Sequence, residues 1–236
     1  MLSKNQIKNI TRLKQKKYRQ QEGLFIAEGG KVIKEFLNST FKLVDLFTTE
    51  TFNVENESII SEADLKKISC LTTPNTALAI FKMPDAKALK NEGLILALDD
   101  IRDPGNLGTI IRLCDWFGIK QLVCSHKTVD CYNPKVVQAT MGSLTRVKIV
   151  YTDLSAYLKA INLPVFGAFM EGKNVYQTNL PKAGILVLGN EANGISSIIE
   201  ACITDKICIP RFGDLQATES LNVATAGAIL LSEFRR

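Results

Sequence analysis

The sequence contains a single histidine, His126, among its 236 residues. This scarcity counts against Ser-His-Asp and Cys-His catalysis, because each scheme needs a histidine as general base. Pairing of His126 with Cys124 or Cys131 is the weaker alternative. The glycine patterns GxGxxG and GxxxxGK[ST] are also absent, so neither a nicotinamide site nor a P-loop is supported. We therefore expect chemistry that proceeds without a histidine.

The six cysteines form no CxxC pair and have no cluster of histidines beside them, which argues against a zinc site. Several lie in apolar runs, where cysteine packs as a small hydrophobe, and a reduced, cytoplasmic compartment fits best. No apolar run approaches the roughly 18 residues of a membrane span, and the first residues lack the apolar centre of a signal peptide. We expect no membrane partner and no metal.

Acidic residues are missing from the first twenty positions, which carry seven basic side chains. The net charge of the chain is +5, so the remaining residues are close to neutral. A basic arm on a near-neutral body is typical of a protein that binds a polyanion. A solvated helix is the simpler alternative, and a mitochondrial presequence fits less well because the arm is rich in Lys rather than Arg. The candidate RNA-binding residues are Lys4, Lys8, Arg12, Lys14, Lys16, Lys17 and Arg19.

Strand-like and helix-like segments alternate along the rest of the chain, which predicts an α/β fold. Residues 1–83 would form the basic arm and a small α/β domain, and the polar stretch 84–93 would be a linker. Residues 94–236 begin with the continuous apolar run "LILALDDI", as expected of a strand covered on both faces. They predict a larger domain built on a mainly parallel sheet.

Three polar loops follow strands of this larger domain: "DDIRDPGNLGTIIR" (99–112), "LVLGNEANGIS" (186–196) and "CIPRFGDLQATESLNVATAG" (208–227). Ligands of parallel sheets bind beyond the carboxyl ends of the strands. Taken singly, each loop is equally well explained by helix capping. Asn106 could cap one helix, and Ser220 or Asn222 could cap the last one.

The three loops in this order resemble the motifs of the SpoU family, also called the TrmH family, of RNA ribose 2′-O-methyltransferases within the SPOUT superfamily. The first motif resembles "NLGTIIR", the second "LGNEANGIS" and the third "IPRFG…SLNVATA". This resemblance covers residues 94–236. In addition, "LFIAEGGKVIKEFL" (24–37) resembles the start of the substrate-binding domain that often precedes the catalytic one.

The resemblance implies S-adenosylmethionine as methyl donor, a deep trefoil knot in the C-terminal domain, and a homodimer. Carried over by motif position, the catalytic residues are Asn106, Arg112, Glu191, Ser220 and Asn222. The cofactor-binding residues are Leu188, Gly189, Ile209 and Leu221, largely through backbone groups. One departure is the spacer Asp214–Glu219, which is longer than the family's pattern and could widen the loop over the cofactor.

The expected reaction is methyl transfer to a ribose 2′-hydroxyl, of ribosomal RNA rather than transfer RNA, because the extra N-terminal domain is common among relatives that modify ribosomal RNA. Three alternatives stay open at this point. The chain could be an RNA-binding module without catalysis, a SPOUT enzyme that methylates a base, or a nucleotide-dependent enzyme of the Rossmann type. The intact polar positions count against the first alternative. The "SLN" segment counts against methylation of a base, and the missing glycine fingerprint counts against the Rossmann type.

Overall fold

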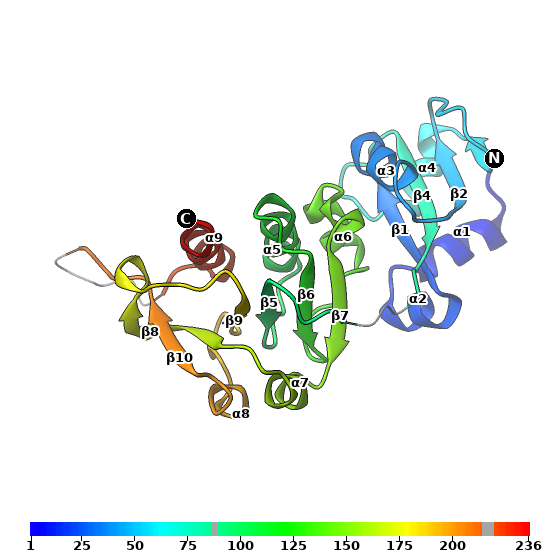
Figure 1. The fold of residues 1–236 in the computed structure, drawn as a ribbon. Helices are drawn as coiled ribbons and strands as arrows, with labels where there is room; N and C mark the ends of the chain where they lie inside the picture. Colours follow the sequence, from blue (N-terminus) through cyan, green and yellow to red (C-terminus); the bar gives the residue numbers. More distant parts are fainter. Residues whose placement is uncertain (86–88, 214–219) are drawn as a thin grey trace. The chain divides into compact units, whose positions relative to one another are not determined.

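The computed structural model describes residues 1–85, 89–213 and 220–236. The predicted longer spacer, Asp214–Glu219, lies outside the described residues. The chain folds into two compact units (Figure 1). The first unit comprises Met1–Ala86 together with Asp130–Thr145, and the second comprises Lys87–Val129 together with Arg146–Arg236.

The first unit contains a four-stranded sheet in the order β1-β4-β2-β3. β4 is antiparallel to β1 and β2, whereas β3 runs parallel to β2. The short strand β3 was not expected from the sequence, because its three residues are mostly polar and exposed. The strands are β1 (Leu24–Glu28), β2 (Leu43–Thr48), β3 (Glu57–Ile59) and β4 (Ala77–Lys82).

Helices cover both faces of this sheet. Side chains of α1 and α4 pack with Ile26, Phe47 and Ile80 on one face. On the other face, Phe25 contacts an aromatic group that includes Phe36 of α3 and Tyr132, which precedes α6. The helices of this unit are α1 (Lys4–Arg12), α2 (Lys16–Glu22), α3 (Gly30–Leu37), α4 (Glu62–Ile68), α6 (Pro134–Thr140) and the 3-10 helix η1 (Ser143–Thr145).

The basic N-terminal segment is part of the folded first unit, and its description as an arm is therefore wrong. Ser3 caps α1 in a reciprocal capping box with Gln6, which satisfies free N–H groups at the helix start. Leu2, Ile10 and Leu13 are buried in the hydrophobic core. Because these apolar side chains alternate with the basic ones, the segment forms amphipathic helices that present only part of their charge to solvent.

The second unit contains a six-stranded sheet in the order β10-β8-β9-β5-β6-β7, in which every neighbouring pair is parallel. The predicted α/β class and parallel sheet are confirmed, while the trefoil knot stays a prediction. The strands are β5 (Leu94–Leu98), β6 (Gln121–Ser125), β7 (Lys148–Thr152), β8 (Val165–Asn174), β9 (Gly184–Leu188) and β10 (Asp205–Cys208).

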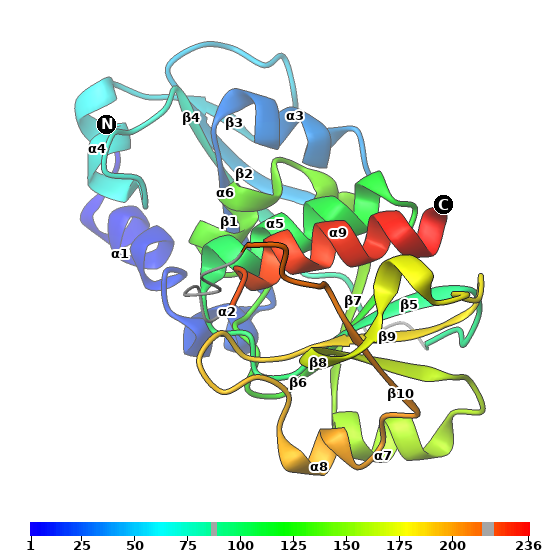
Figure 2. The same cartoon turned by 90° about the vertical axis from the view of Figure 1, so that its left-hand side faces the viewer.

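Two pairs of helices enclose this sheet, α5 and α9 on one face and α7 and α8 on the other (Figure 2). Leu154 and Leu158 of α7 and Ile199 of α8 share a buried cluster with alternate residues of the central strands. A Cβ on Gly227 of α9 would lie 3.1 Å from Leu188, so α9 packs closely on the end of β9. The helices are α5 (Pro104–Trp116), α7 (Leu154–Ala160), α8 (Ser197–Glu200), α9 (Val223–Arg235) and the 3-10 helix η2 (Val175–Gln177).

The strand order places the predicted loops together. From β5 the chain continues to β6 and β7 on one side, whereas β9, β8 and β10 lie on the other side of β5. Such a reversal of strand order is the point at which parallel sheets hold their ligands. β5 and β9 pair in register up to Leu98 and Leu188, so the loops that follow these two strands leave the sheet side by side.

Candidate active site

The loop after β5 presents Asn106 from the first turn of α5. The cap of this helix is Asp103, whose carboxylate accepts a hydrogen bond from the Asn106 backbone N–H at 2.8 Å. Pro104 occupies the first turn, where its missing N–H costs nothing. Asn106 is therefore not the cap that the sequence allowed. Its side-chain amide is left to make contacts outside the helix.

The loop after β9 closes tightly on itself. A Cβ on Gly189 would lie 2.2 Å from the backbone carbon of Gly194, so only glycine fits. Asn190 is buried and holds the loop: its amide nitrogen donates to the Asp100 carbonyl at 2.6 Å, and its oxygen accepts from the backbone N–H of Ala192 at 3.0 Å. These contacts fix the position from which Glu191 extends.

A continuous chain of hydrogen bonds links one residue from each of the three predicted motifs. The Asn222 side-chain nitrogen donates to the Asn106 side-chain oxygen at 2.9 Å. The Asn106 nitrogen in turn donates to Glu191 Oε1, also at 2.9 Å. The Asn222 oxygen caps α9 by accepting from the backbone N–H groups of Ala224 and Thr225 at 2.9 and 3.3 Å. We call Glu191, Asn106 and Asn222 the motif chain.

The hydrogen bonds of the motif chain run in one direction, from Asn222 through Asn106 to Glu191, because each amide group has a defined donor and a defined acceptor. The oxygen of Asn222 must accept from the start of α9, which leaves its nitrogen to face Asn106. Asn106 must then present its oxygen to Asn222 and its nitrogen to the carboxylate of Glu191. Capping and site formation are thus two functions of the same asparagine, Asn222.

Arg112 and Ser220 are not joined to the motif chain. Arg112 is exposed on α5, and within the described ranges its side chain makes no hydrogen bond or ion pair. Ser220 is also exposed, directly after the segment that is not described. Both side chains are available to a ligand, and their catalytic roles stay a prediction.

The predicted cofactor positions differ in character. The Leu188 side chain is buried, and it packs under α9. The peptide groups of Gly189, Ile209 and Leu221 form no hydrogen bond with other residues that the structure describes. Leu221 is 47% exposed. Peptide groups at the ends of β9 and β10 and before α9 that have no partner among the described residues are available to a ligand, and the backbone contacts expected for S-adenosylmethionine stay a prediction.

Supporting residues that the sequence analysis did not single out stand beside the motif chain. Asp100 has a positive φ of 60°, a conformation that few non-glycine residues adopt. Its carboxylate forms an ion pair with Arg102, at 3.1 Å to Nε and 2.9 Å to Nη2. This contact, together with the nearby Glu191, raises the pKa of Arg102 above its usual value. No spacing in the sequence indicates this pair.

The seven predicted RNA-binding residues fall into two groups in the first unit. Arg19 is 1% exposed, and its guanidinium is bonded to Asp130 at 2.5 Å and to the carbonyls of Leu13 and Lys14. The inclusion of Arg19 among the RNA contacts is therefore corrected, because its charge is neutralised inside the fold. Arg12 pairs with Glu22 at 2.8 Å.

The remaining lysines keep their charge at the surface. Lys14 donates to the Ser69 carbonyl at 2.7 Å while staying exposed. The exposed lysines of the two N-terminal helices are Lys4, Lys8, Lys16 and Lys17.

Comparison with known proteins identifies the family. Residues 93–232 match the sequence profile of the SpoU rRNA methylase family. The chain belongs to this family. Residues 4–79 match the MRM3-like substrate binding domain. The family predicted from the three motifs is thereby confirmed.

Relatives align along the whole chain. The 23S rRNA (guanosine(2553)-2′-O)-methyltransferase RlmP of Bacillus subtilis is 29% identical, over 99% of this chain and 97% of its own length. Among solved structures, a TrmH-family protein from Porphyromonas gingivalis is 41% identical with a TM-score of 0.90, covering 100% of this chain and 98% of its own. An AdoMet-bound rRNA methyltransferase from Sinorhizobium meliloti is 27% identical with a TM-score of 0.87, covering 100% and 96%.

The described residues contain neither a candidate membrane span nor a candidate metal site. None of the helices there is long and apolar enough to cross a membrane. No group of three or more His, Cys, Asp and Glu side chains in the same residues is arranged to hold a metal ion.

Proposed function

We propose that this protein transfers a methyl group from S-adenosylmethionine to a ribose 2′-hydroxyl of ribosomal RNA. The observation that carries this proposal is the motif chain, which ties the three family motifs together at the switch point of the parallel sheet. The full-length relative from Bacillus subtilis is named as an enzyme of this reaction class. The supported substrate class is ribosomal rather than transfer RNA, since the relative from Bacillus subtilis is named a 23S rRNA methyltransferase and residues 4–79 match an MRM3-like substrate binding domain.

S-adenosylmethionine supplies an electrophilic methyl group. When bound, it would allow methylation of the ribose 2′-oxygen, with S-adenosylhomocysteine as the leaving group and the hydroxyl proton released to solvent. The peptide groups of Gly189, Ile209 and Leu221, which form no hydrogen bond with other described residues, would hold the cofactor by its adenine edge. This use of the backbone leaves the charged side chains for the RNA.

Arg112 is assigned the positioning of the RNA. A guanidinium stays protonated in proteins, so Arg112 acts as a donor and not as a base. It would bind the phosphate next to the target ribose and the 2′-oxygen, bidentately where geometry allows. Such positioning can supply roughly 7–11 kcal/mol of the barrier in well-oriented reactions. Ser220 is exposed and closely precedes Asn222 of the motif chain in the sequence. It would contact the ribose.

Glu191 anchors the second motif in this proposal and does not orient Arg112. Its carboxylate accepts from Asn106 at 2.9 Å, and within the described residues it has no bond to Arg112. The motif chain would therefore keep the two loops and the start of α9 at a constant separation. That separation sets the space for the sulfonium and the ribose.

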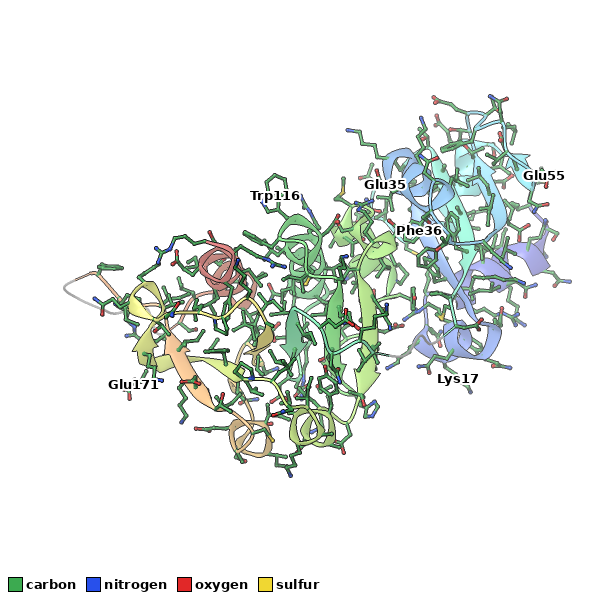
Figure 3. The ribbon with its side chains drawn as sticks, viewed as in Figure 1. Lys17, Glu35, Phe36, Glu55, Trp116 and Glu171 are labelled. Carbon is green, nitrogen blue, oxygen red and sulfur yellow. The ribbon has the colours of Figure 1, made fainter. Side chains whose placement is uncertain are left out.

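We also propose that the protein works as a homodimer in the cytoplasm, where ribosomal RNA is modified. Support for the dimer comes from Trp116 on α5, which is 84% exposed (Figure 3). Tryptophan is enriched at protein interfaces, where its large surface becomes buried. Light scattering after size exclusion should give a dimer mass for the wild type and a lower mass for Trp116→Lys. A monomeric wild type would contradict the dimer.

The reaction is tested by incubating the protein with methyl-labelled S-adenosylmethionine and total RNA from a strain that lacks its gene. The RNA is separated by size and digested to nucleosides. Label in one 2′-O-methylnucleoside of the large ribosomal RNA is the expected result. Label in a base would instead identify a base methyltransferase. Cofactor binding without label in either naked RNA or assembling ribosomal particles would contradict catalysis.

A further inference from the structure

Arg102 lies in the loop between β5 and α5, and its side chain is 67% exposed. Its backbone N–H donates to Glu191 Oε2 at 3.5 Å, so the residue stands next to the motif chain. The Asp100 carboxylate holds its guanidinium, with Nε 3.1 Å from Oδ1 and Nη2 2.9 Å from Oδ2. This pair precedes the first family motif, which begins at Asn106, and the proposed function gives it no role.

The backbone of Asp100 is fixed in a conformation that few non-glycine residues adopt, with a φ of 60°. Its N–H donates to Ser125 Oγ at 2.9 Å, and its carbonyl accepts from Asn190 Nδ2 at 2.6 Å. Contacts from the end of β6 and from the second motif loop therefore hold the strained residue in place. Strain of this kind is concentrated at functional sites. Its result here is a carboxylate aimed at Arg102.

The guanidinium of Arg102 has a second edge that is open to a ligand. Arginine carries five N–H donors in a rigid planar fork. Asp100 takes the edge formed by Nε and Nη2. The edge formed by Nη1 and the other N–H of Nη2 makes no hydrogen bond or ion pair with any described residue. Two parallel N–H donors of this kind bind two oxygens of a phosphate, so Arg102 is a pre-oriented oxyanion donor.

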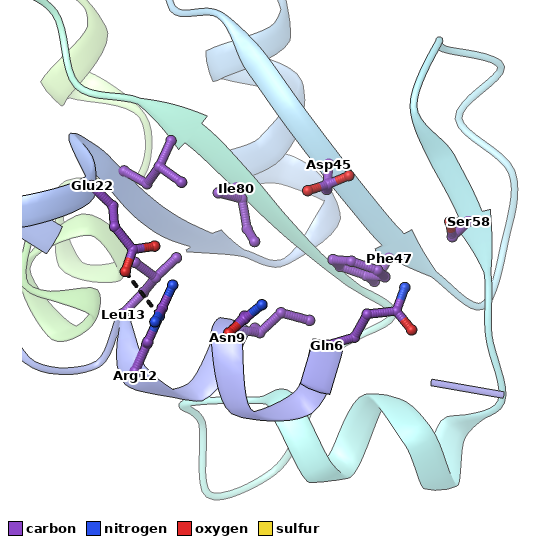
Figure 4. A pocket seen from close by; sticks show the side chains of 11 residues that line it. Gln6, Asn9, Arg12, Leu13, Glu22, Asp45, Phe47, Ser58 and Ile80 are labelled. Atoms are coloured by element: carbon purple, nitrogen blue, oxygen red, sulfur yellow. Dashed lines mark ion pairs between the residues drawn. The ribbon is translucent and has the colours of Figure 1, made fainter. Parts of the chain in front are cut away.

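Two other arginines show that an ion pair alone does not create such a donor. Arg12 pairs with Glu22 at 2.8 Å at one end of a cleft in the first unit (Figure 4), and its side chain is only 38% exposed. Arg146 Nε lies 2.9 Å from Asp115 Oδ2, but Arg146 precedes β7 and therefore lies at the amino ends of the strands. Of the three, Arg102 alone presents an exposed guanidinium at the carboxyl ends of the strands, where parallel sheets bind ligands.

The groups that this edge leaves to a ligand are donors. Asp103 and Glu191 already accept N–H groups of Asn106, one from its backbone and one from its side chain. Lys127 is exposed in the loop after β6, which pairs with β5, so it adds a positive charge on the same edge. A strand whose ribose reaches the motif chain would therefore meet Arg102 with one of its phosphates.

We propose that Arg102 binds a phosphate of the RNA strand near the target ribose, and that Asp100 positions its guanidinium. Arg112 is assigned the phosphate next to that ribose, and Arg102 would hold another phosphate of the same strand. Two phosphate contacts fix the direction of the strand, which one contact alone leaves open to rotation. This proposal rests on the proposed function for its RNA substrate.

The phosphate contact is tested by the salt dependence of binding. Large-subunit ribosomal RNA from a strain that lacks the gene is titrated with the full-length protein over a series of KCl concentrations. Loss of one phosphate contact should make the slope of log K against log salt about 0.7 shallower for Arg102→Ala. Arg102→Lys keeps the charge and should keep the slope. Arg146→Ala is the matched control, an ion-paired arginine at the opposite edge, and it should also keep the wild-type slope.

Asp100→Asn tests the positioning role. Asparagine tolerates a positive φ, and both peptide hydrogen bonds of residue 100 can remain, so the change removes the ion pair alone. Loss of a negative charge does not weaken the attraction of RNA. We therefore expect a KM for RNA no higher than that of the wild type and a kcat about tenfold lower, because the strand is held in a less exact position. Calorimetry with S-adenosylhomocysteine and thermal unfolding should match the wild type.

An unchanged salt slope in Arg102→Ala would overturn the proposal, as would an equal change in Arg146→Ala. A loss of kcat in Asp100→Asn that is accompanied by lower Tm and weaker S-adenosylhomocysteine binding would make the pair a support of the loop and nothing more. The slope needs no turnover, so the two proposals can fail separately. Methyl transfer by the wild type without a slope change in Arg102→Ala rejects the phosphate contact alone. A slope change without transfer to any RNA rejects the reaction and keeps the contact.

Discussion

Asn222 permits a test that separates helix capping from catalysis. Its oxygen caps α9, whereas its nitrogen donates to Asn106 at 2.9 Å. Asn222→Asp keeps the capping oxygen, and aspartate is as good an N-cap as asparagine. It places a negative charge at the helix N-terminus, which the helix dipole favours. However, it removes the N–H donor and sets a carboxylate against the Asn106 oxygen.

The expected result is a stable enzyme with low activity. For Asn222→Ala, loss of the cap costs about 1 kcal/mol, and for a chain of this size that lowers the Tm by roughly 2–4 °C. Asn222→Asp should keep the Tm within about 1 °C of the wild type, since the cap and the dipole interaction are retained. In both variants the motif chain is broken. A shift of about 1 Å in the loops would reduce methyl transfer on the order of 100-fold.

The assay combines single-turnover methyl transfer at saturating S-adenosylmethionine with calorimetric unfolding. Asp153→Ala is the matched control, because Asp153 caps α7 through the Ala156 N–H at 3.0 Å and lies outside the motif chain. This control should lower the Tm like Asn222→Ala and leave the transfer rate unchanged. Wild-type activity in a stable Asn222→Asp would refute the reasoning, because it would reduce Asn222 to a cap.

Three further outcomes are expected. Arg112→Lys should keep the wild-type Tm, since Arg112 is exposed. In the same transfer assay it should reduce kcat by about 10- to 100-fold, because an ammonium cannot replace bidentate contacts. Full turnover of this variant would exclude the bidentate role. Gly189→Ala should destabilise the protein by about 1–3 kcal/mol in a denaturant titration, since the added Cβ would lie 2.2 Å from backbone; an unchanged midpoint would show that the loop can move. Burial, with the charge of Glu28, raises the pKa of the Cys70 thiol to about 12, so iodoacetamide at pH 8.5 should leave native Cys70 unmodified in a mass spectrum, while the denatured chain reacts.

The sequence allowed the alternation of strands and helices and the family to be predicted, because both depend on local patterns. The continuous apolar run "LILALDDI" located β5, and the apolar start of "LVLGNEANGIS" located the end of β9. Asn106, Glu191 and Asn222 were named through the resemblance. Their direct contact follows from the strand order, which brings together residues more than eighty positions apart.

Long-range burial could not be predicted. Seven basic residues in one segment indicate a charged surface, yet nothing near Arg19 shows that its partner is Asp130, 111 positions away. The ion pair of Asp100 with Arg102 depends on a positive φ, which a non-glycine residue rarely signals. The charged residues can be read from the sequence, whereas packing determines which of their side chains are exposed.

The return of Asp130–Thr145 to the first unit limits how this protein can be divided or recombined. A fragment ending at Ala86 would retain Arg19 without its carboxylate partner and Phe25 without Tyr132. Leaving one member of a buried ion pair alone costs about 3–5 kcal/mol, a large share of a small domain's stability. An exchange of the RNA-binding part between relatives would therefore have to replace two separate stretches of the gene at once. We therefore expect the two units to have been inherited together and not exchanged separately between relatives.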